Sequence, residues 1–539
     1  MNNQTMNNEL NLVEKQKIII DRYFEITNQS LRVCPKCKQA KTDEEIKDSE
    51  LEIDTINRIT KNSLLTFNYF FNWCPSCITK DDFLSVVHSI DYDCSKCTIN
   101  NFNLFHECES NEYYVIHDIG ESKLFECMKC NQYFSDGIFC VTCDYSLCKR
   151  CMKLNYYFPI DNTNLFNKEE LCYWSKMSRP VISKKIKDLI QSFYEYKVIH
   201  GTPQEKNCYS NLTLNDCINR LIKLRPLTFY GEKDHWKLRN GEMGTGDWEL
   251  IGTEESRPEL SIDEYLTYDE LQIGSMLSIS TNTPFINDGN RYNGGKVMYN
   301  RPFPEGWYVA QVGSRFEKKN KMEYLHMIIE EQPKRIVAEK AWTDFYEIDH
   351  FPDYREAVLD ETGRFQRVQH NFFFDTLIYK KRTSYLAKVF LDEANDRGRQ
   401  TSKKAFCHIV GLGLGVWMID ELQISIMVNV YLDLIYKNKY KHIGVLYFAW
   451  LTPPEWFPTK INGIQIVFGK REPAERLPKE YTLVAQYAWD SNAYPGNEFW
   501  IDNLTASGDP AAASCSLLYY LQNPDYNHYI DSEFLKVFN

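Results

Sequence analysis

The sequence predicts an α/β protein, with a mixed, largely parallel sheet in a C-terminal domain that follows a cysteine-rich region. From about residue 256, short apolar strand-like runs alternate with segments of helical spacing. Of the 18 cysteines, 13 lie between Cys34 and Cys151. A chain of 539 residues with 43% hydrophobic side chains is large enough for more than one core.

Four segments follow from these changes in composition. We expect a polar tail at 1–30 with a short helix at 15–26, a cysteine-rich region at 31–155, a helical connector at 156–255 and the α/β domain at 256–539. The first residues lack the apolar core of a signal peptide, and the longest apolar run, 405–419, contains three glycines. We therefore expect a cytoplasmic protein, with the nucleus as the alternative, and no membrane partner. The net charge of −12 makes nucleic acid an unlikely partner.

Individual elements follow from periodicity. Helical spacing occurs at 183–196, 212–224, 261–276, 372–394 and 420–436, and a polar turn is expected at 395–403. Strand patterns occur at 307–312, 325–330, 405–410, 443–450, 464–468 and 483–488. The segment 420–436 also fits a period of two, but its length and Asp420 as a candidate N-cap favour a helix.

Twelve cysteines of the N-terminal region form six pairs with the spacing C-x-x-C. Such a turn places two thiolates on one side of a tight knuckle, and two knuckles complete a tetrahedral zinc site. Reduced structural cysteines would not explain the regular gap. The pairs are Cys34/Cys37, Cys74/Cys77, Cys94/Cys97, Cys127/Cys130, Cys140/Cys143 and Cys148/Cys151, with His106, Cys108 and His117 as further candidate ligands.

The last three pairs resemble ZZ-type and C1-like (DC1) zinc fingers. The resemblance implies one Zn²⁺ on Cys127, Cys130, Cys148 and Cys151 and another on Cys140 and Cys143, and His117 occupies the position of the leading histidine of a C1-like finger. The histidine pair of a ZZ finger and the final cysteine of a C1-like finger are missing. Two further sets could each close a site of their own: Cys94, Cys97, His106 and Cys108, and Cys34, Cys37, Cys74 and Cys77. Sites without an open position are structural, so the region is expected to bind protein.

A glycine-rich turn lies between an expected strand and helix of the C-terminal domain. Gly411, Gly413 and Gly415 allow close backbone approach, so that amides at a helix start could bind a phosphate. The spacing lacks the last glycine of the dinucleotide-binding motif, and a tight turn without ligand is the alternative.

About 75 residues further on, acidic side chains are interspersed with Gly, Pro and Asn. Asp490, Glu498 and Asp509 are candidate catalytic acids, because closely spaced carboxylates on a kinked loop suit sugar chemistry. Asp509 precedes Pro510 and a helical Ala run, so it could instead cap a helix. Four more residues are candidate ligand contacts, with a solvated loop as the alternative for the last two: Asn492, Asn497, Asn287 and Arg291.

Four segments together resemble the MavL-like domain: 265–291, 309–317, the GLGLGVW turn, and AWDSNAYPGNEFW with SGDPAAA. The resemblance implies a three-layer macrodomain related to poly(ADP-ribose) glycohydrolase. It also implies hydrolysis of an ADP-ribosyl bond, with ADP-ribosylated ubiquitin as one substrate. By position, the three essential acids of the family match Asp490, Glu498 and Asp509. Glu498 would replace an Asp, and the gap to Asp509 differs by one residue.

In this interpretation Glu498 is the general acid/base, and Asp490 and Asp509 hold ribose hydroxyls or the attacking water. The leading hypothesis is an ADP-ribosylhydrolase whose zinc region selects the modified protein. The alternatives are a non-catalytic ADP-ribose reader and a ubiquitin-pathway adaptor or ligase.

Overall fold

The computed structural model describes residues 162–539 apart from 333, 370, 497, 498 and 500–507, together with five short strands nearer the N-terminus. The chain divides into two compact units, Met1–Asn155 and Tyr156–Asn539. In the first, the strands form an antiparallel sheet β1–β4–β5 and a pair β2–β3. Their bounds are β1 Tyr113–Ile116, β2 Phe125–Glu126, β3 Tyr133–Phe134, β4 Gly137–Cys140 and β5 Ser146–Cys148. Cys140 and Cys148 end β4 and β5, and the other predicted zinc ligands lie outside the described residues.

The second unit is built on a nine-stranded sheet with the order β17–β18–β16–β15–β19–β11–β10–β6–β20. The run from β11 to β18 is parallel, whereas β10 is antiparallel to both of its neighbours. This confirms the predicted α/β fold with a mixed, mostly parallel sheet. The strands are β6 Arg179–Ser183, β10 Ser278–Pro284, β11 Glu305–Gln311, β15 Lys404–Ile409, β16 Ile443–Ala449, β17 Lys460–Ile461, β18 Ile464–Gly469, β19 Tyr481–Ala488 and β20 Lys536–Phe538.

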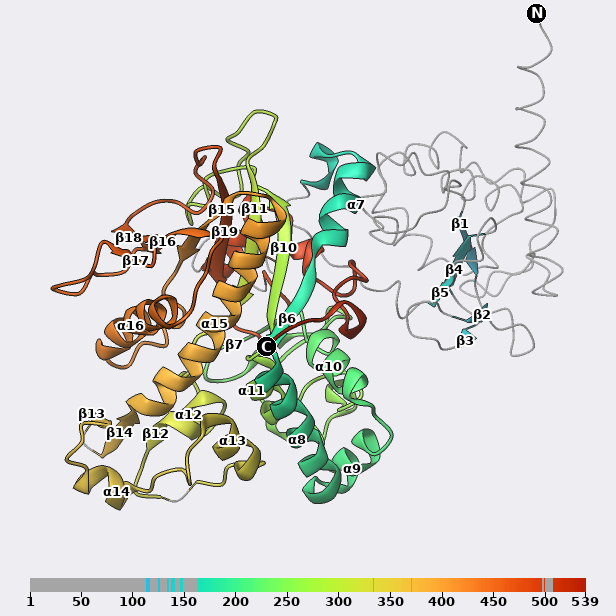
Figure 1. Ribbon diagram of the computed structural model, residues 1–539. Helices are drawn as coiled ribbons and strands as arrows, with labels where there is room; N and C mark the ends of the chain where they lie inside the picture. The colour runs from blue at the N-terminus through green and yellow to red at the C-terminus, as the bar shows by residue number, and fades with distance from the viewer. Residues whose placement is uncertain are drawn as a thin grey trace, which may run out of the picture. The chain divides into compact units, whose positions relative to one another are not determined.

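Helices cover both faces of this sheet. On one face, α15 (Thr376–Gln400) and α16 (Leu422–Lys437) pack against apolar side chains of β11, β15, β16 and β19, and Figure 1 shows α15 crossing the sheet diagonally. Strand residues alternate between faces. Accordingly, Ser280 bonds Glu393 of α15, whereas Thr281 contacts Ser178 beside α7 (Lys168–Met177). The second face also carries α17 (Gly508–Cys515), whose Cys515 contacts Tyr308.

The remaining elements gather at one end of the sheet, the lower end in Figure 1. They include two small antiparallel sheets, β7–β8–β9 and β12–β14–β13. The helices are α8 Lys184–His200, α9 Pro203–Tyr209, α10 Leu214–Lys223, α11 Tyr268–Gly274, α12 Glu323–Met327, α13 Glu339–Tyr346 and α14 Tyr354–Leu359, and α18 Leu518–Leu521 packs on β10. The strands are β7 Thr228–Tyr230, β8 His235–Lys237, β9 Met243–Thr245, β12 Ile328–Ile329, β13 Phe365–Gln369 and β14 Phe372–Asp375.

Most predicted elements are present: helices as α8, α10 and α16, and strands as β11, β15, β16, β18 and β19. Three differ. The helix expected at 261–276 begins only at Tyr268, where Thr267 and Glu270 form a capping box. Of the strand expected at 325–330, residues 325–327 lie in α12 and only Ile328–Ile329 form a strand, β12. The helix expected from 372 starts at Thr376, after β14, because the Asp375 carboxylate accepts from the amides of Leu377 and Ile378.

Helix α15 also continues to Gln400, into the turn expected at 395–403. Arg397 bonds Glu393 one turn earlier, and both side chains are fully buried. This contact continues the helix into a charged stretch that looks like a turn in the sequence.

The expected connector at 156–255 does contain helices, but it is part of the second unit and does not link separate domains. Its strand β6 pairs with β10 and β20, and Val181 and Ile182 are completely buried. Buried apolar side chains on a strand that is paired on both sides hold this segment in the same core.

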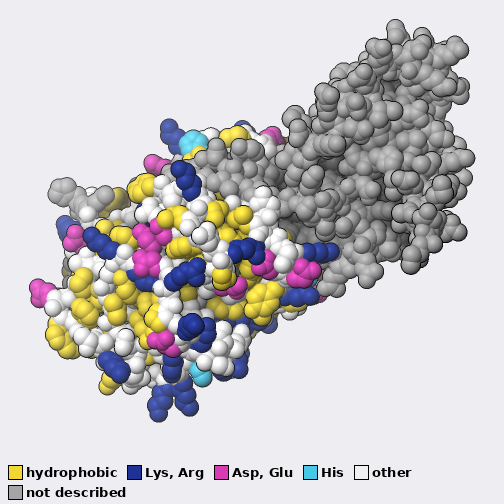
Figure 2. Space-filling model, turned by 90° about the horizontal axis from the view of Figure 1, so that it is seen from above, with side chains coloured by type: hydrophobic (Ala, Val, Ile, Leu, Met, Phe, Trp, Pro, Cys, Tyr) yellow, Lys and Arg dark blue, Asp and Glu magenta, His cyan; other side chains and the backbone are white. Residues whose placement is uncertain are grey.

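On the face of the second unit that Figure 2 shows, neither charge predominates. Figure 2 shows acidic and basic side chains intermingled on the face turned to the viewer. None of the helices in the described part of the chain is long and apolar enough to cross a bilayer.

A fragment covering 156–539 is therefore expected to unfold cooperatively on heating, whereas 256–539 is expected to aggregate or lack a thermal transition. The shorter fragment removes β6 and α8 and exposes an edge of β10. Circular dichroism with size-exclusion chromatography checks this. Equal melting temperatures for the two fragments would contradict it.

Candidate active site

Three loops meet at one edge of the sheet. Strands β11, β19 and β15 are parallel neighbours, so the loops that follow Gln311, Ala488 and Ile409 all leave from the same edge. The glycine turn at 411–415 follows β15, and Asp490 follows β19. The two loops that the sequence singled out therefore share one edge of the sheet.

The glycine turn is packed against the loop that follows β11. Gly413 has φ +71°, and a Cβ on Gly313 would lie only 2.3 Å from the Gly413 nitrogen. Such an approach of two backbones requires glycine. Gly411 closes the turn by accepting from the Leu414 amide (3.1 Å), and Gly415 is exposed. The buried Ser314 hydroxyl, next to Gly313, has no hydrogen-bond partner among the described residues.

The loop between β19 and α17, called the acidic loop from here on, begins with a compact turn at Asp490. Asp490 is half-buried, and its Oδ1 accepts from the amides of Asn492 (2.9 Å) and Ala493 (3.3 Å). Between them, Ser491 has φ +62°, a left-handed conformation that is uncommon outside glycine. The buried Asn492 accepts at Oδ1 from Arg315 (2.8 Å). In this structure Asn492 thus serves to hold the loop.

Asp509 connects the start of α17 to Gly496 in the acidic loop. It is the second residue of α17, and its Oδ1 accepts from the Gly496 amide at 2.8 Å. The side chain is 4% exposed, and the preceding Gly508 lies beside Ala488 at the end of β19. Asn497 and Glu498, which lie between Gly496 and Asp509 in the sequence, are outside the described residues.

The structure does not bring Asn287 and Arg291 to this edge. They follow Pro284, which pairs with Glu305 at the start of β11 and therefore lies at the opposite end of the sheet. Asn287 is fully buried, donates to the Ser514 carbonyl and accepts from the Gly289 amide, while Arg291 is exposed. The polar composition of this loop reflects its own turns.

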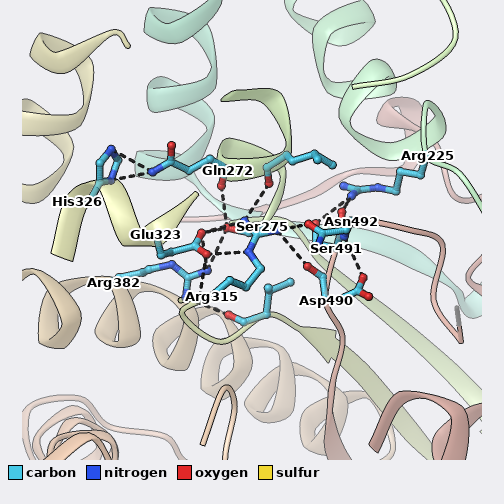
Figure 3. A network of polar contacts seen from close by, with 12 residues as sticks. Arg225, Gln272, Ser275, Arg315, Glu323, His326, Arg382, Asp490, Ser491 and Asn492 are labelled. Carbon is cyan, nitrogen blue, oxygen red and sulfur yellow. Dashed lines mark hydrogen bonds and ion pairs between the residues drawn. The ribbon is translucent and has the colours of Figure 1, made fainter. Parts of the chain in front are cut away.

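A buried ion pair beneath the acidic loop is absent from the sequence prediction (Figure 3). Arg315 donates through Nε and Nη2 to the two carboxylate oxygens of Glu323 at 2.7 and 2.9 Å. Its Nη1 donates to the Asp490 carbonyl (3.1 Å) and to Asn492. Arg382 of α15 donates to the Val312 carbonyl (3.0 Å) and lies 3.4 Å from Glu323. This cluster fixes the loops after β11 and β19 to each other.

Electrostatics in the cluster favour the ionised carboxylate. Burial alone raises the pKa of Glu323, but the charges of Arg315 and Arg382 outweigh it and lower the pKa to about 2. Burial lowers the pKa of the neighbouring His326 to about 3, so this imidazole is neutral at physiological pH. One of the two arginines is thus in excess over the single carboxylate and increases the positive potential under the loop.

Sequence reasoning missed these residues because charged side chains in a core cannot be told from surface ones without contacts. The sequence offered one indication, the position of Arg315 in VAQVGSRFE three residues after the end of the predicted strand 307–312, whose side chains are buried in the structure. Among the described residues no group of three His, Cys, Asp or Glu side chains could hold a metal ion.

A mostly parallel sheet with helices on both faces places this unit among the open α/β folds, whose ligands characteristically bind beyond the carboxyl edge of the sheet, where the glycine turn and the acidic loop lie. Residues 158–539 match the family described as ADP-ribosylhydrolase MavL-like. The chain therefore belongs to the MavL-like ADP-ribosylhydrolase family. Two similar proteins of Drosophila melanogaster are ADP-ribosylarginine hydrolase CG3568, 32% identical over 396 residues (66% of this chain, 77% of the relative), and ADP-ribosylarginine hydrolase CG2909, 31% identical over 392 residues (66% and 76%).

Replacing Glu323 by Gln in the 156–539 fragment is expected to lower the free energy of unfolding at pH 7 by about 3–5 kcal/mol, since two buried arginines lose their counter-charge. The folded-state pKa lies below the ordinary 4.5, so the stabilisation is present above pH 4.5 and is lost as pH falls towards about 2. The difference between wild type and variant should therefore narrow over that range in urea titrations. Glu347→Gln, which removes an exposed ion pair with Lys185, should change stability by less than about 1 kcal/mol. A difference from wild type that stays constant with pH would contradict the assignment.

Proposed function

We propose that this chain hydrolyses the N-glycosidic bond between ADP-ribose and an arginine side chain of a modified protein. Its family membership and the names of the two Drosophila relatives support this substrate class. The carrying observation is the packing of the glycine turn against the loop of Gly313, at the edge where the acidic loop begins. An ADP-ribosyl group offers a pyrophosphate for backbone amides and a ribose for carboxylates, and the two loops provide these groups side by side.

The fold that we propose for this unit is a three-layer macrodomain. The helices on both faces of the mostly parallel sheet support it. The glycine turn would then bind the pyrophosphate, and the acidic loop would surround the ribose whose anomeric carbon reacts.

The chemistry is displacement by water at that anomeric carbon. The carbon–nitrogen bond breaks, the water oxygen bonds to the carbon, and the departing guanidine nitrogen gains a proton. Positive charge develops on the ribose ring in an oxocarbenium-like transition state, which nearby carboxylates stabilise. We assign general acid/base catalysis to Glu498 and the holding of ribose hydroxyls or water to Asp490 and Asp509. The positions of Asp490 and Asp509 at the two ends of the loop support this division.

Asn substitutions at Asp490 and Asp509, and Gln at Glu498, are expected to reduce release of ADP-ribose from an ADP-ribosylarginine substrate by roughly 100-fold or more each. The substituted side chains at positions 490 and 509 keep an oxygen that can accept the hydrogen bonds from the backbone amides of Asn492 and Gly496, so the loop geometry is retained. Chromatographic detection of free ADP-ribose measures the rate.

The matched control is Asp288→Asn, an acid that also forms a loop turn but follows the far end of β10. It should keep near wild-type activity. Wild type that binds ADP-ribose in calorimetry without releasing it from any substrate would identify a reader and exclude hydrolysis.

For the N-terminal unit we propose structural Zn²⁺ bound by the six C-x-x-C pairs, in a module that selects the modified protein. The regular two-residue spacing supports it. The names of the curated relatives specify ADP-ribosylarginine and do not mention ubiquitin.

Full-length protein purified without chelator is expected to contain more than one zinc ion per chain by mass spectrometry of the metal, and the 156–539 fragment none. The double substitution Cys127→Ser and Cys130→Ser should lower the zinc content by about one ion, because a site that loses two thiolates cannot stay tetrahedral. Full-length protein without zinc would contradict the proposal.

A further inference from the structure

A second arginine contacts the acidic loop from the side opposite to Arg315. Arg225 follows α10 and is 1% exposed. Its Nη1 donates to the backbone carbonyl of Ser491 and to Ser491 Oγ (2.9 Å), and its guanidinium carbon lies 4.8 Å from the centre of the Trp489 ring. Arg225 therefore contacts both chain neighbours of Asp490, as Figure 3 shows for Ser491.

Unlike Arg315, Arg225 has no carboxylate within ion-pair distance among the described residues, and its Nε has no hydrogen-bond partner there. Burial lowers its pKa to about 9, with Asp490 acting in the opposite direction and Arg315 adding to the decrease. The group still carries a charge at neutral pH. A buried cation without a direct counter-ion is unfavourable for folding, so a role in the site explains it better than stability does.

The surrounding chain is built to admit this guanidinium. A Cβ on Gly274, the last residue of α11, would lie 3.1 Å from Arg225 Nη2. Tyr494 ties the segment to the acidic loop, because its hydroxyl donates to the Lys223 carbonyl and its amide to the Pro226 carbonyl. Arg225 is thus held on both sides, and the loop is held by it.

We infer that Arg225 is a positioning residue of the acidic loop: it holds Ser491 in the left-handed conformation and thereby sets the direction of the Asp490 carboxylate. A serine at φ +62° relaxes towards negative φ unless a contact holds its backbone. Rotation at Ser491 would break the two hydrogen bonds that the Asp490 Oδ1 atom accepts from the backbone amides of Asn492 and Ala493. The effect of Arg225 on kcat rests on the proposed hydrolysis, whereas its effect on the conformation of the acidic loop does not.

The test compares Arg225→Met, Arg225→Lys, Ser491→Gly and the double variant R225M/S491G in full-length protein. R225M should lower kcat by roughly 10- to 100-fold while KM changes less than about threefold, since displacing a catalytic group by about 1 Å has this effect. Glycine adopts positive φ without a clamp, so S491G alone should stay near wild type and should recover about tenfold in the R225M background.

Hydrogen exchange supplies a readout that does not depend on activity. Peptides covering 489–496 should exchange faster in R225M and return towards wild type in the double variant. The control is Arg397→Met, which removes another buried arginine stacked on a tryptophan, Trp307 (3.7 Å), but on α15, away from the acidic loop. It should lower thermal stability without changing exchange in 489–496.

Two results would overturn the inference: folded R225M with wild-type kcat and exchange, or an R225M defect that Lys restores and S491G does not, which would assign Arg225 an electrostatic role. If wild type releases no ADP-ribose, the proposed function fails, and the exchange data alone decide the role of Arg225.

Discussion

The bidentate ion pair between Arg315 and Glu323 is the interaction on which the rest of the site depends. It is fully buried, and its remaining donors reach the Asp490 carbonyl and Asn492. A buried ion pair adds little net stability over apolar packing, but it has a strict geometry. Here that geometry fixes the separation between two loops that leave neighbouring strands and carry different chemistry. The loop after β11 supports the glycine turn through Gly313, and the loop after β19 carries Asp490.

A second constraint on the acidic loop comes from the segment 156–255. This segment supplies β6 to the sheet and Arg225 to the acidic loop, so the contact at Ser491 comes from a segment almost 270 residues earlier in the chain. A sheet alone could position the two loops only to within the freedom of their own backbones. Two arginines from different parts of the chain, bound to consecutive residues of one loop, remove most of that freedom before substrate arrives. Such preorganisation is more effective for charge stabilisation than groups that must reorient during the reaction.

Sequence patterns were sufficient for five of the nine strands, β11, β15, β16, β18 and β19, because these are apolar runs with regular spacing. The strands β6, β10, β17 and β20 were not predicted; β10 reads SISTNTP and has no such run. The sequence also indicated both loops, since Gly411–Gly415 and Asp490–Asp509 each follow such a run. It failed where a local pattern competes with a tertiary contact. Arg397 continues α15 through a stretch that looks like a turn, because Glu393 pairs with it inside the core. Asn287 looked like a ligand residue, yet its amide satisfies the end of α17. Arg225 carried no local signal, because its only distinguishing property is which distant residues it contacts.

The placement of charge in the site also bears on which roles Asp490, Glu498 and Asp509 can have in the proposed hydrolysis. Arg315 and Arg382 surround one carboxylate, and Arg225 has none in direct contact, so the described residues beneath the acidic loop carry an excess of positive charge. The Asp490 carboxylate acts to raise the pKa of Arg225, so these two groups attract each other. A group that donates a proton needs the opposite surroundings, away from buried cations and close to other acids. Asp509 approaches the loop from α17 and is held by the Gly496 amide, on the part of the loop that leads to Glu498. In the proposed hydrolysis we therefore assign proton donation to Glu498 and not to Asp490, which lies beside the arginines.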